Sequence, residues 1–305
     1  MEKIAFLFAG QGSQYVGMGQ DLYQAFAESK AIFEQADKVL GFSISNLCFS
    51  GPLEKLGPTD VSQPAIFTVT MAAFEAFKAR VDVKPSFAAG LSLGEYTALV
   101  AAGCLSFAEG LRLVRQRGVI MDEAARKYPG KMAAVIGLPS DKVKEVCLVA
   151  GSQIANVNAP GQIVISGKVE AVDKSKALLM QSGAKRVVEL AVSGGFHSSL
   201  MQEAAGELKM LLDKTAISEP RLPVISNFTA RAEYKITEIR ENLASQMYSP
   251  VRWEDSMRFM LKQGINKFFE FGPGKVLKGL MRRIDENAQV INIEKKEDIL
   301  NLESG

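Results

Sequence analysis

The chain has 305 residues, of which 47% are hydrophobic and 23% charged, and its formal net charge is +2. These values exclude a disordered or fibrous protein, leave room for one large core or two unequal lobes, and exclude the strongly basic surface of a nucleic-acid-binding protein. The three cysteines, Cys48, Cys104 and Cys147, form no Cys-x-x-Cys pair or His/Cys cluster, so we predict no metal site, no disulfide framework and a cytoplasmic location.

The first part of the chain alternates predicted strands and helices. In order they are strand Ile4–Phe8, helices around Gln20–Leu40 and Pro64–Arg80, strand Phe87–Ala89, a helix through Ala102 and helix Phe107–Lys127. This alternation predicts an α/β fold with a mainly parallel, hydrolase-like sheet and flanking helices. The apolar run Ala98–Leu105 is far below the ~20 residues of a membrane span, and the N-terminus lacks a convincing signal-peptide cleavage site. We predict no membrane contact.

A different pattern occupies the middle of the chain. Its predicted elements are strand Met132–Gly137, helix Asp141–Ala150, strands Ile154–Asn158 and Ile163–Ser166, helix Val169–Ser182 and strand Arg186–Ala191. The order βαββαβ is the ferredoxin-like pattern. We therefore predict a small ferredoxin-like subdomain over residues 129–196, inserted into a large α/β subdomain formed by residues 1–128 and 197–305.

The large subdomain then resumes. Its remaining predicted elements are helix Ser199–Lys214, strand Val224–Asn227, helices through Gln263 and strand Lys267–Phe271. Strands again alternate with helices, which supports a single α/β sheet interrupted by the insertion.

One Gly-x-Ser-x-Gly motif, Gly90–Gly94, follows the predicted strand Phe87–Ala89. This strand–turn–helix context is the one that a nucleophile elbow requires, and the glycines permit its sharp turn. Free amides at the start of the next helix point toward Ser92, so the Leu93 N–H is a candidate oxyanion donor. The alternative is an ordinary serine on a glycine-flanked turn, because the motif also occurs by chance.

His197 is the only histidine in the chain. A serine enzyme with a histidine base would therefore have to pair Ser92 with His197. The positive end of the helix predicted after His197 disfavours imidazolium and keeps the ring ready to accept a proton. No Asp or Glu is evident as a third group, and a backbone carbonyl is an alternative. A purely structural histidine is the other interpretation.

Arg117 lies in the middle of an apolar helix face, where a leucine would be expected. That face consists of Leu113, Val114, Ile120, Met121 and Ala124. A buried guanidinium needs partners, since an unpaired buried charge is costly. Arg117 is either half of a structural ion pair with an internal Asp or Glu, or a clamp for a substrate carboxylate.

Gln11 lies in the glycine-rich segment that follows the first predicted strand. The segment has neither Gly-x-Gly-x-x-Gly nor Gly-Lys-[Ser/Thr], the motifs typical of phosphate-binding loops. Gln11 is instead a candidate for a second oxyanion amide.

Taken together, several short segments resemble one enzyme family. They are Ala9–Gln14, Gly90–Glu95, Arg115–Gly118, Asn156–Asn158 with Pro160–Gln162, Gly195–His197 and Phe271–Gly274. In this order they resemble the malonyl-CoA:acyl carrier protein transacylases of type II fatty acid synthesis. The resemblance spans nearly the whole chain and includes the inserted ferredoxin-like subdomain.

The resemblance implies a role for each candidate residue. Ser92 would be the nucleophile and His197 its base. Gln11 and the Leu93 amide would form the oxyanion hole, and Arg117 would bind the malonyl carboxylate.

Three further positions follow from the same resemblance. Gln246 matches the residue whose backbone carbonyl orients the histidine. Phe196 is bulky where relatives that accept branched methylmalonyl units tend to carry something smaller, which implies selection against branched acyl groups. Leu91 departs from the family, which commonly has histidine there, and we expect little effect on the chemistry because that neighbour is not the family's base.

The activity implied by the resemblance is an [acyl-carrier-protein] S-malonyltransferase that supplies fatty acid synthesis. It would use malonyl-CoA and acyl carrier protein as partners, pass through a malonyl-serine, and need no cofactor or metal. A stand-alone polyketide acyltransferase would use the same chemistry with another carrier protein. A lipase-like serine hydrolase would share the elbow but have no use for Arg117, and a binding module with a dead site is the non-enzyme alternative.

Overall fold

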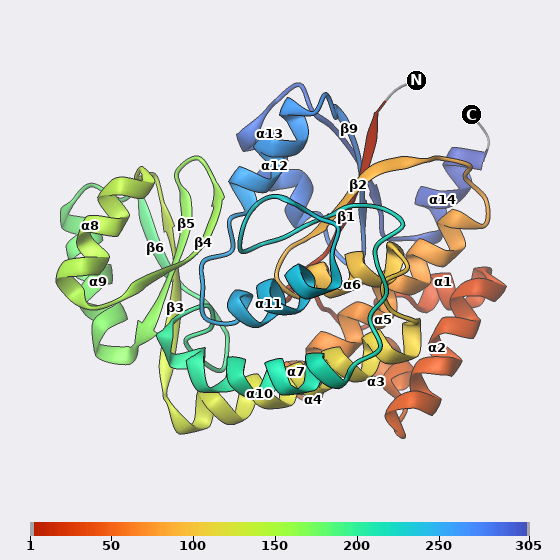
Figure 1. The fold of residues 1–305 in the computed structure, drawn as a ribbon, viewed down its shortest axis with the longest axis horizontal. Coiled ribbons are helices and arrows are strands. Elements are labelled where there is room, and N and C mark those ends of the chain that lie inside the picture. Colours follow the sequence, from red (N-terminus) through yellow and green to blue (C-terminus); the bar gives the residue numbers. More distant parts are fainter. Residues whose placement is uncertain (1–2, 304–305) are drawn as a thin grey trace.

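The computed structural model describes residues 3–303. Within that range the chain forms a six-stranded sheet flanked by helices and a separate four-stranded sheet with its own two helices (Figure 1). The α/β fold predicted from the sequence is confirmed. Among these residues, no helix combines the length and the apolar character that crossing a membrane would require.

The six-stranded sheet is mainly parallel and has the order β10-β9-β1-β2-β7-β8. Its strands are β1 (Ile4–Phe8), β2 (Pro85–Gly90), β7 (Val224–Ile225), β8 (Ala232–Glu233), β9 (Lys267–Phe271) and β10 (Gln289–Ile293). Only the β7–β8 pair is antiparallel among these.

Helices cover both faces of this sheet (Figure 1). They are α1 (Gln20–Ala25), α2 (Ala27–Leu40), α3 (Ile44–Ser50), α4 (Leu53–Leu56), α5 (Thr59–Lys78), α6 (Leu93–Ala101), α7 (Phe107–Lys127), α10 (Gln202–Lys214), α11 (Ile236–Gln246), α12 (Trp253–Lys262), α13 (Val276–Ile284) and α14 (Lys296–Glu303), with a short 3-10 turn at Ser199–Met201.

All five residues of β1 are buried, which explains its continuous apolar sequence. Ile4, Phe6 and Phe8 belong to one hydrophobic cluster, and Ala5 and Leu7 belong to another. Successive side chains of a strand point to opposite faces, so β1 contributes to a core on each side of the sheet. A parallel strand buried on both faces has the near-continuous apolar run seen here.

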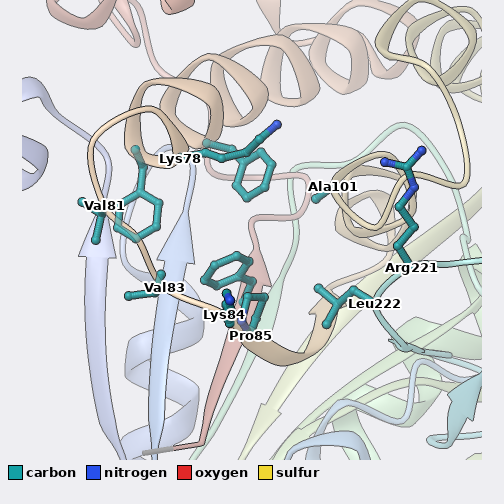
Figure 2. Close-up of a pocket in the computed structure, with 11 residues that line it drawn as sticks. Lys78, Val81, Val83, Lys84, Pro85, Ala101, Arg221 and Leu222 are labelled. Carbon is teal, nitrogen blue, oxygen red and sulfur yellow. The ribbon is translucent and has the colours of Figure 1, made fainter. Parts of the chain in front are cut away.

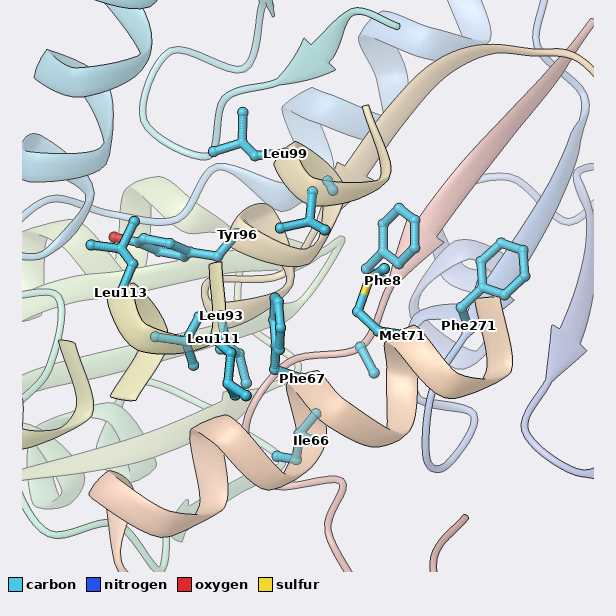
Figure 3. Close-up of a cluster of buried hydrophobic side chains, with 14 of the residues drawn as sticks. Phe8, Ile66, Phe67, Met71, Leu93, Tyr96, Leu99, Leu111, Leu113 and Phe271 are labelled. Carbon is cyan, nitrogen blue, oxygen red and sulfur yellow. The ribbon is translucent and has the colours of Figure 1, made fainter. Parts of the chain in front are cut away.

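The first cluster packs α5 and α6 against the sheet (Figure 3). The ring of Phe74 from α5 lies 5.6 Å from the ring of Phe8 and 5.3 Å from that of Phe271. The second cluster contains Trp253 of α12 and Leu277 of α13. The site described below therefore rests on a sheet that is packed on both faces.

Helix α5 begins at Thr59, five residues before the start at Pro64 that the sequence analysis predicted. Proline has no N–H and leaves the carbonyl four residues earlier without its helical donor. That carbonyl belongs to Asp60, and it accepts a hydrogen bond from the Arg115 guanidinium instead. An interior proline is thus tolerated because α7 supplies the missing donor.

The four-stranded sheet has the order β4-β5-β3-β6, and all its pairs are antiparallel. Its elements are β3 (Gly130–Ile136), α8 (Ser140–Ala150), β4 (Gln153–Ala159), β5 (Gln162–Lys168), α9 (Val169–Gln181) and β6 (Arg186–Glu189). The predicted βαββαβ order is confirmed. Backbone hydrogen bonds from Val157 to Val251 and from Val251 to Ala155 attach β4 to the larger part of the chain. The exact boundaries at residues 129 and 196 stay a prediction.

The sequence pattern did not indicate the last elements of the chain. It predicted nothing after Phe271, where the structure adds α13, β10 and α14. It also extended β7 to Asn227, whereas β7 ends at Ile225. Asn227 leaves the strand because its main chain and side chain bind the turn that carries Ser92, as described next.

Candidate active site

Ser92 occupies the sharp turn between β2 and α6. Its backbone angles, φ 51° and ψ −98°, lie in a region that L-residues rarely adopt. Gly90 and Gly94 make the turn possible: a Cβ on Gly90 would lie 2.0 Å from the Gly94 carbonyl carbon, and one on Gly94 would lie 2.2 Å from the Phe8 oxygen. The strain is the kind that is held by surrounding structure at functional sites.

His197 lies between Ser92 and a backbone carbonyl. Its Nε2 is 2.9 Å from Ser92 Oγ, and its Nδ1 is 2.7 Å from the carbonyl oxygen of Gln246. A carbonyl can only accept a hydrogen bond, so the proton of the neutral ring sits on Nδ1. Nε2 is then left with a lone pair that faces the Ser92 hydroxyl.

The imidazole of His197 is 4% exposed, and its pKa is lowered from 6.5 to about 4. Burial is the largest cause, the nearby Arg117 charge acts in the same direction, and the Gln246 carbonyl opposes both. The sequence analysis expected a neutral ring from the dipole of the next helix. The structure gives burial and Arg117 as the reasons, since α10 begins only at Gln202, after the 3-10 turn.

Arg117 of α7 is fully buried and points at Ser92. Its Nη2 donates to Ser92 Oγ at 3.1 Å and to Gln246 Oε1 at 3.0 Å, and its Nη1 donates to Gln63 Oε1 at 2.7 Å. Its guanidinium also stands 5.1 Å from the centre of the Tyr96 ring. Within residues 3–303 Arg117 forms no ion pair, so the structural ion-pair interpretation does not describe its surroundings.

The two candidate oxyanion donors belong to segments that meet at the Ser92 turn. Leu93 is the first residue of α6, so its N–H has no acceptor within the helix. Gln11 follows β1 in a loop that touches the elbow: a Cβ on Gly10 would lie 2.5 Å from the Leu91 oxygen. The Gln11 side chain is fixed by Thr59 and Gln63, each at 3.3 Å.

Gln246 contributes more than the backbone carbonyl that the resemblance implied. Its side-chain Nε2 donates to the Ser92 carbonyl oxygen at 3.0 Å and to Glu95 Oε2 at 2.7 Å. Its Oε1 accepts from Arg117. One residue therefore touches the Ser92 backbone, His197 and Arg117.

Two functional candidates escaped the sequence analysis. Asn227 Oδ1 accepts the Ser92 N–H at 2.6 Å, and its Nδ2 donates to the Gly90 carbonyl at 2.8 Å. Gln63 lies on α5 and is fully buried beside Arg117. The available signals were a polar residue just after a parallel strand, a usual place for functional groups, and a glutamine within an apolar helix.

Phe196 and Leu91 have no partner that defines a role. Phe196 is 4% exposed and belongs to the core cluster on the α5 side of the sheet. Leu91 is half-buried and packs against the opposite cluster. Their effects on acyl selectivity and on tuning of the site stay predictions.

Of two cavities in the structure, one adjoins the site and the other is remote from it. One, of about 400 Å³, lies beside His197 between α8 and the segment 248–255. Another, of about 320 Å³, is lined by Phe77, Lys84, Pro85 and Arg221 at the start of β2 (Figure 2). Ser92 follows the opposite end of β2, roughly 20 Å along a six-residue strand at ~3.3 Å per residue. The second cavity is therefore separate from the Ser–His pair.

These features define the class of protein. A strained serine, a neutral histidine held by a carbonyl, a free amide and a buried arginine are the groups that a serine acyl-transfer enzyme for an anionic acyl group requires. No cluster of three or more His, Cys, Asp or Glu side chains suited to a metal occurs within residues 3–303.

Comparison with known proteins places the chain in a family. Residues 5–294 match the acyl transferase domain family, and the chain belongs to it. It is 44% identical over 304 residues to a Bacillus subtilis (strain 168) protein named malonyl CoA-acyl carrier protein transacylase, covering 98% of this chain and 96% of the relative. A protein of the same name from Staphylococcus aureus (strain MSSA476) is 41% identical over 308 residues, covering 98% of each.

Solved structures agree with this placement. An acyl carrier protein S-malonyltransferase from Vibrio cholerae superposes with a TM-score of 0.95 at 38% identity, covering 99% of this chain and all of that one. A malonyl-transacylase solved in complex with a type II PKS acyl-carrier protein gives a TM-score of 0.97 at 36% identity, covering 99% of each chain. Both parts of the fold, including the four-stranded sheet, thus recur in enzymes named for malonyl transfer.

Proposed function

We propose that this chain is an [acyl-carrier-protein] S-malonyltransferase, which moves malonyl from malonyl-CoA to the phosphopantetheine thiol of acyl carrier protein and so supplies fatty acid synthesis. The observation that carries the proposal is the Arg117 guanidinium 3.1 Å from Ser92 Oγ. It places a buried cation beside the atom that would carry the acyl group, close to a short acyl chain that ends in a carboxylate. The names of the relatives agree with this substrate and this partner.

In the first half-reaction, His197 Nε2 accepts the Ser92 proton while Oγ attacks the thioester carbon of malonyl-CoA. The amides of Gln11 and Leu93 would stabilise the oxyanion of the tetrahedral intermediate. The carbon–sulfur bond then breaks, and the imidazolium returns the proton to the leaving CoA thiolate. Malonyl-Ser92 and free CoA are the products.

In the second half-reaction, the carrier thiol gives its proton to His197 and its sulfur attacks the malonyl ester. The intermediate collapses, the ester bond breaks, and Ser92 Oγ recovers its proton from the imidazolium. The two steps balance in atoms and charge without an oxidant or reductant, so we propose that no metal or redox cofactor takes part. We also propose a cytoplasmic location, because the three buried, unpaired cysteines fit a reducing compartment.

A lipase-like hydrolase would share Ser92 and His197 but would gain nothing from a buried guanidinium aimed at the nucleophile. A polyketide acyltransferase would share the whole site and differ in its carrier. The structure favours neither over malonyl transfer to acyl carrier protein.

Intact-mass spectrometry after incubation with malonyl-CoA tests the proposal. We expect one malonyl adduct on the wild type, discharged by added holo-carrier protein faster than by water, and none on Ser92→Ala. An adduct that persists in Ser92→Ala, or that maps to a cysteine, would contradict the nucleophile. Discharge by water at the rate seen with carrier would favour the hydrolase.

A further inference from the structure

The geometry points to Gln63 as a specificity-determining residue, one that holds Arg117 toward Ser92 with a neutral amide and so leaves the charge of the guanidinium for the carboxylate of the acyl group. This inference rests on the proposed function, because it explains how the site prefers an acyl group that ends in an anion.

Two glutamine amides fix the position of Arg117. Gln63 Oε1 accepts from Nη1 at 2.7 Å, and Gln246 Oε1 accepts from Nη2 at 3.0 Å. Both glutamines are 1% exposed or less. A buried arginine is usually paired with a carboxylate, since burial of an unpaired charge is costly. Here neutral acceptors take that place, and Nε has no hydrogen-bond partner within residues 3–303.

Gln63 reaches Arg117 from α5, across the close contact between α5 and α7. A Cβ on Gly118 would lie 2.8 Å from the Asp60 Cα, so only glycine lets the two helices approach this closely. The Gln63 amide nitrogen is meanwhile 3.3 Å from Gln11 Oε1 and 3.3 Å from Met121 Sδ. These contacts fix which end of the amide faces Arg117, because only the oxygen can accept from a guanidinium.

The nearest acid does not neutralise Arg117 either. Glu95 Oε2 binds the Gln246 amide at 2.7 Å and the Asn227 N–H at 3.0 Å, so the Gln246 side chain stands between the carboxyl and the guanidinium. Burial, with the Glu233 charge adding to it, raises the pKa of Glu95 to about 8. The carboxyl is then mostly protonated at neutral pH, so it offsets only part of the charge of Arg117.

The consequence is selectivity by charge. An acyl group with a terminal carboxylate gives the guanidinium an anionic partner on reaching Ser92, whereas acetyl leaves it without one. A carboxylate at position 63 would keep an acceptor for Nη1 but would form the ion pair itself. It would neutralise the guanidinium charge that the substrate carboxylate needs, with almost no change in side-chain volume.

The experiment compares wild type, Gln63→Glu and Gln63→Met. Gln63→Glu adds a charge at nearly constant shape, and Gln63→Met removes the amide without adding charge. For each, the rate of Ser92 acylation is measured by quenched-flow mass spectrometry with malonyl-CoA, acetyl-CoA and malonamyl-CoA, the neutral amide isostere of malonyl-CoA. Thermal unfolding confirms that each variant is folded.

We expect Gln63→Glu to lower the malonyl-to-acetyl rate ratio at least about tenfold, the range associated with a hydrogen bond to a charged group. Its preference for malonyl over malonamyl should fall likewise, whereas Gln63→Met, which loosens Arg117 without adding charge, should lower the malonyl-to-acetyl ratio much less. If Gln63→Glu does not fold, Gln246→Glu presents the same charge from the other side and should show the same fall.

Equal losses for malonyl and acetyl in Gln63→Glu would overturn the inference, because Gln63 would then act only by positioning. A similar fall of the ratio in Gln63→Met would overturn it as well, since hydrogen bonding rather than neutrality would set selectivity. If the wild type forms no malonyl-Ser92, the proposed function itself is refuted. The wild type alone shows this outcome, so it can be told apart from a failure of the inference about Gln63.

Discussion

At the scale of single residues, His197, the proposed base, is oriented by a neutral carbonyl rather than by a carboxylate. A carboxylate beside Nδ1 would stabilise imidazolium, whereas the Gln246 carbonyl opposes the effects of burial and Arg117 only in part. The neutral form of His197 is therefore the resting form over a wide pH range. Arg117 thus affects both partners of the dyad, through a hydrogen bond to Ser92 and through its charge on His197.

The pH dependence of acylation follows from His197. Its base form is neutral, and with a folded-state pKa of about 4 that form is lost only as the pH falls through about 4. The rate of malonyl-Ser92 formation should be nearly flat from about pH 5 to 7, below the pKa of about 8 of Glu95, and His197→Ala should lower it by about 10²–10⁴-fold. Rapid-quench mass spectrometry across this range checks the profile. A midpoint near 6.5, the ordinary value for histidine, would show that the ring is not desolvated as described.

Arg117 should decide which acyl group is accepted. A hydrogen bond to a charged group is worth about 1.5–3 kcal/mol, so Arg117→Ala should lower malonyl transfer by roughly 10–150-fold. Acetyl transfer should be retained or rise, because no unpaired charge is left in the site. Steady-state rates with malonyl-CoA and acetyl-CoA measure both effects. An equal decrease for the two substrates would mean that Arg117 serves the structure rather than substrate selection.

At the scale of secondary-structure elements, Asn227 connects three of them. It follows β7, and its side chain binds the last residue of β2 and the Ser92 N–H, while its main-chain N–H binds Glu95 of α6. It thus holds the strained turn through both the strand before Ser92 and the helix after it. Asn227 lies beyond the end of β7, and from there it binds the turn.

Asn227→Ala should slow acylation of Ser92 by about 10²-fold, since a displacement of about 1 Å can have such an effect. Asn227→Asp keeps the acceptor for the Ser92 N–H but loses the donor to Gly90, so we expect a smaller loss. The KM for malonyl-CoA should change little in both. Asn287→Ala, at an exposed position, serves as the control. Full activity of Asn227→Ala in a folded protein would show that β2 and α6 hold the turn without it.

Helix α13 presents a basic face. Lys275, just before it, and Lys278, Arg282 and Arg283 within it are exposed. The residues of α13 that are buried are Leu277, Leu280, Met281 and Ile284. Carrier proteins of this kind are acidic, so α13 is a docking candidate.

Arg282→Glu with Arg283→Glu should raise the KM for carrier protein, and more so at low salt. Hydrolysis of malonyl-CoA should be unchanged, and Lys214→Glu, on α10, is the matched control. Unaltered carrier kinetics would make these charges ordinary solvated surface.

At the scale of the whole molecule, local patterns predicted the architecture well. Alternating apolar strands and amphipathic helices indicate an α/β sheet, and the inserted βαββαβ order is readable because each of its elements is short and bounded by glycine or polar residues. Helix Phe107–Lys127 was predicted with its observed bounds. Helix α13 was missed because its apolar residues follow a glycine-rich turn and lie among four basic side chains.

The candidate site was predictable only in part. Ser92 and His197 could be paired from the sequence because the chain offers one elbow motif and one histidine. Gln63 and Asn227 could not be found in that way, because they lie 54 residues from Arg117 and 135 residues from Ser92 in sequence and meet them only through packing. Their residue type, a buried amide, also carries no motif.

Three buried acids affect the stability of the molecule as a whole. Burial raises the pKa of Glu95 and Glu233, and it raises that of Glu270 to about 7 although the N–H groups of Leu277 and Lys278 oppose it. A raised folded-state pKa contributes stability below the unfolded value of 4.5, and this contribution is lost as the pH rises through the folded value. The lowered pKa of His197 has the opposite effect: its contribution to stability rises with pH, but only between about pH 4 and 6.5.

Above about pH 6.5 only the buried acids still make the free energy of unfolding depend on pH. The midpoint of thermal unfolding should therefore fall between about pH 6.5 and 8. Each pKa unit corresponds to about 1.4 kcal/mol of unfolding free energy, so the fall should be measurable by calorimetry in buffers of matched ionic strength. Glu270→Gln removes one of the titrating groups and keeps an oxygen for one of its two N–H partners, and it should flatten the slope below about pH 7. Glu286→Gln, at an exposed position, should leave the slope as it is. A midpoint that is constant or rises over this range would mean that the buried acids are already ionised in the folded protein.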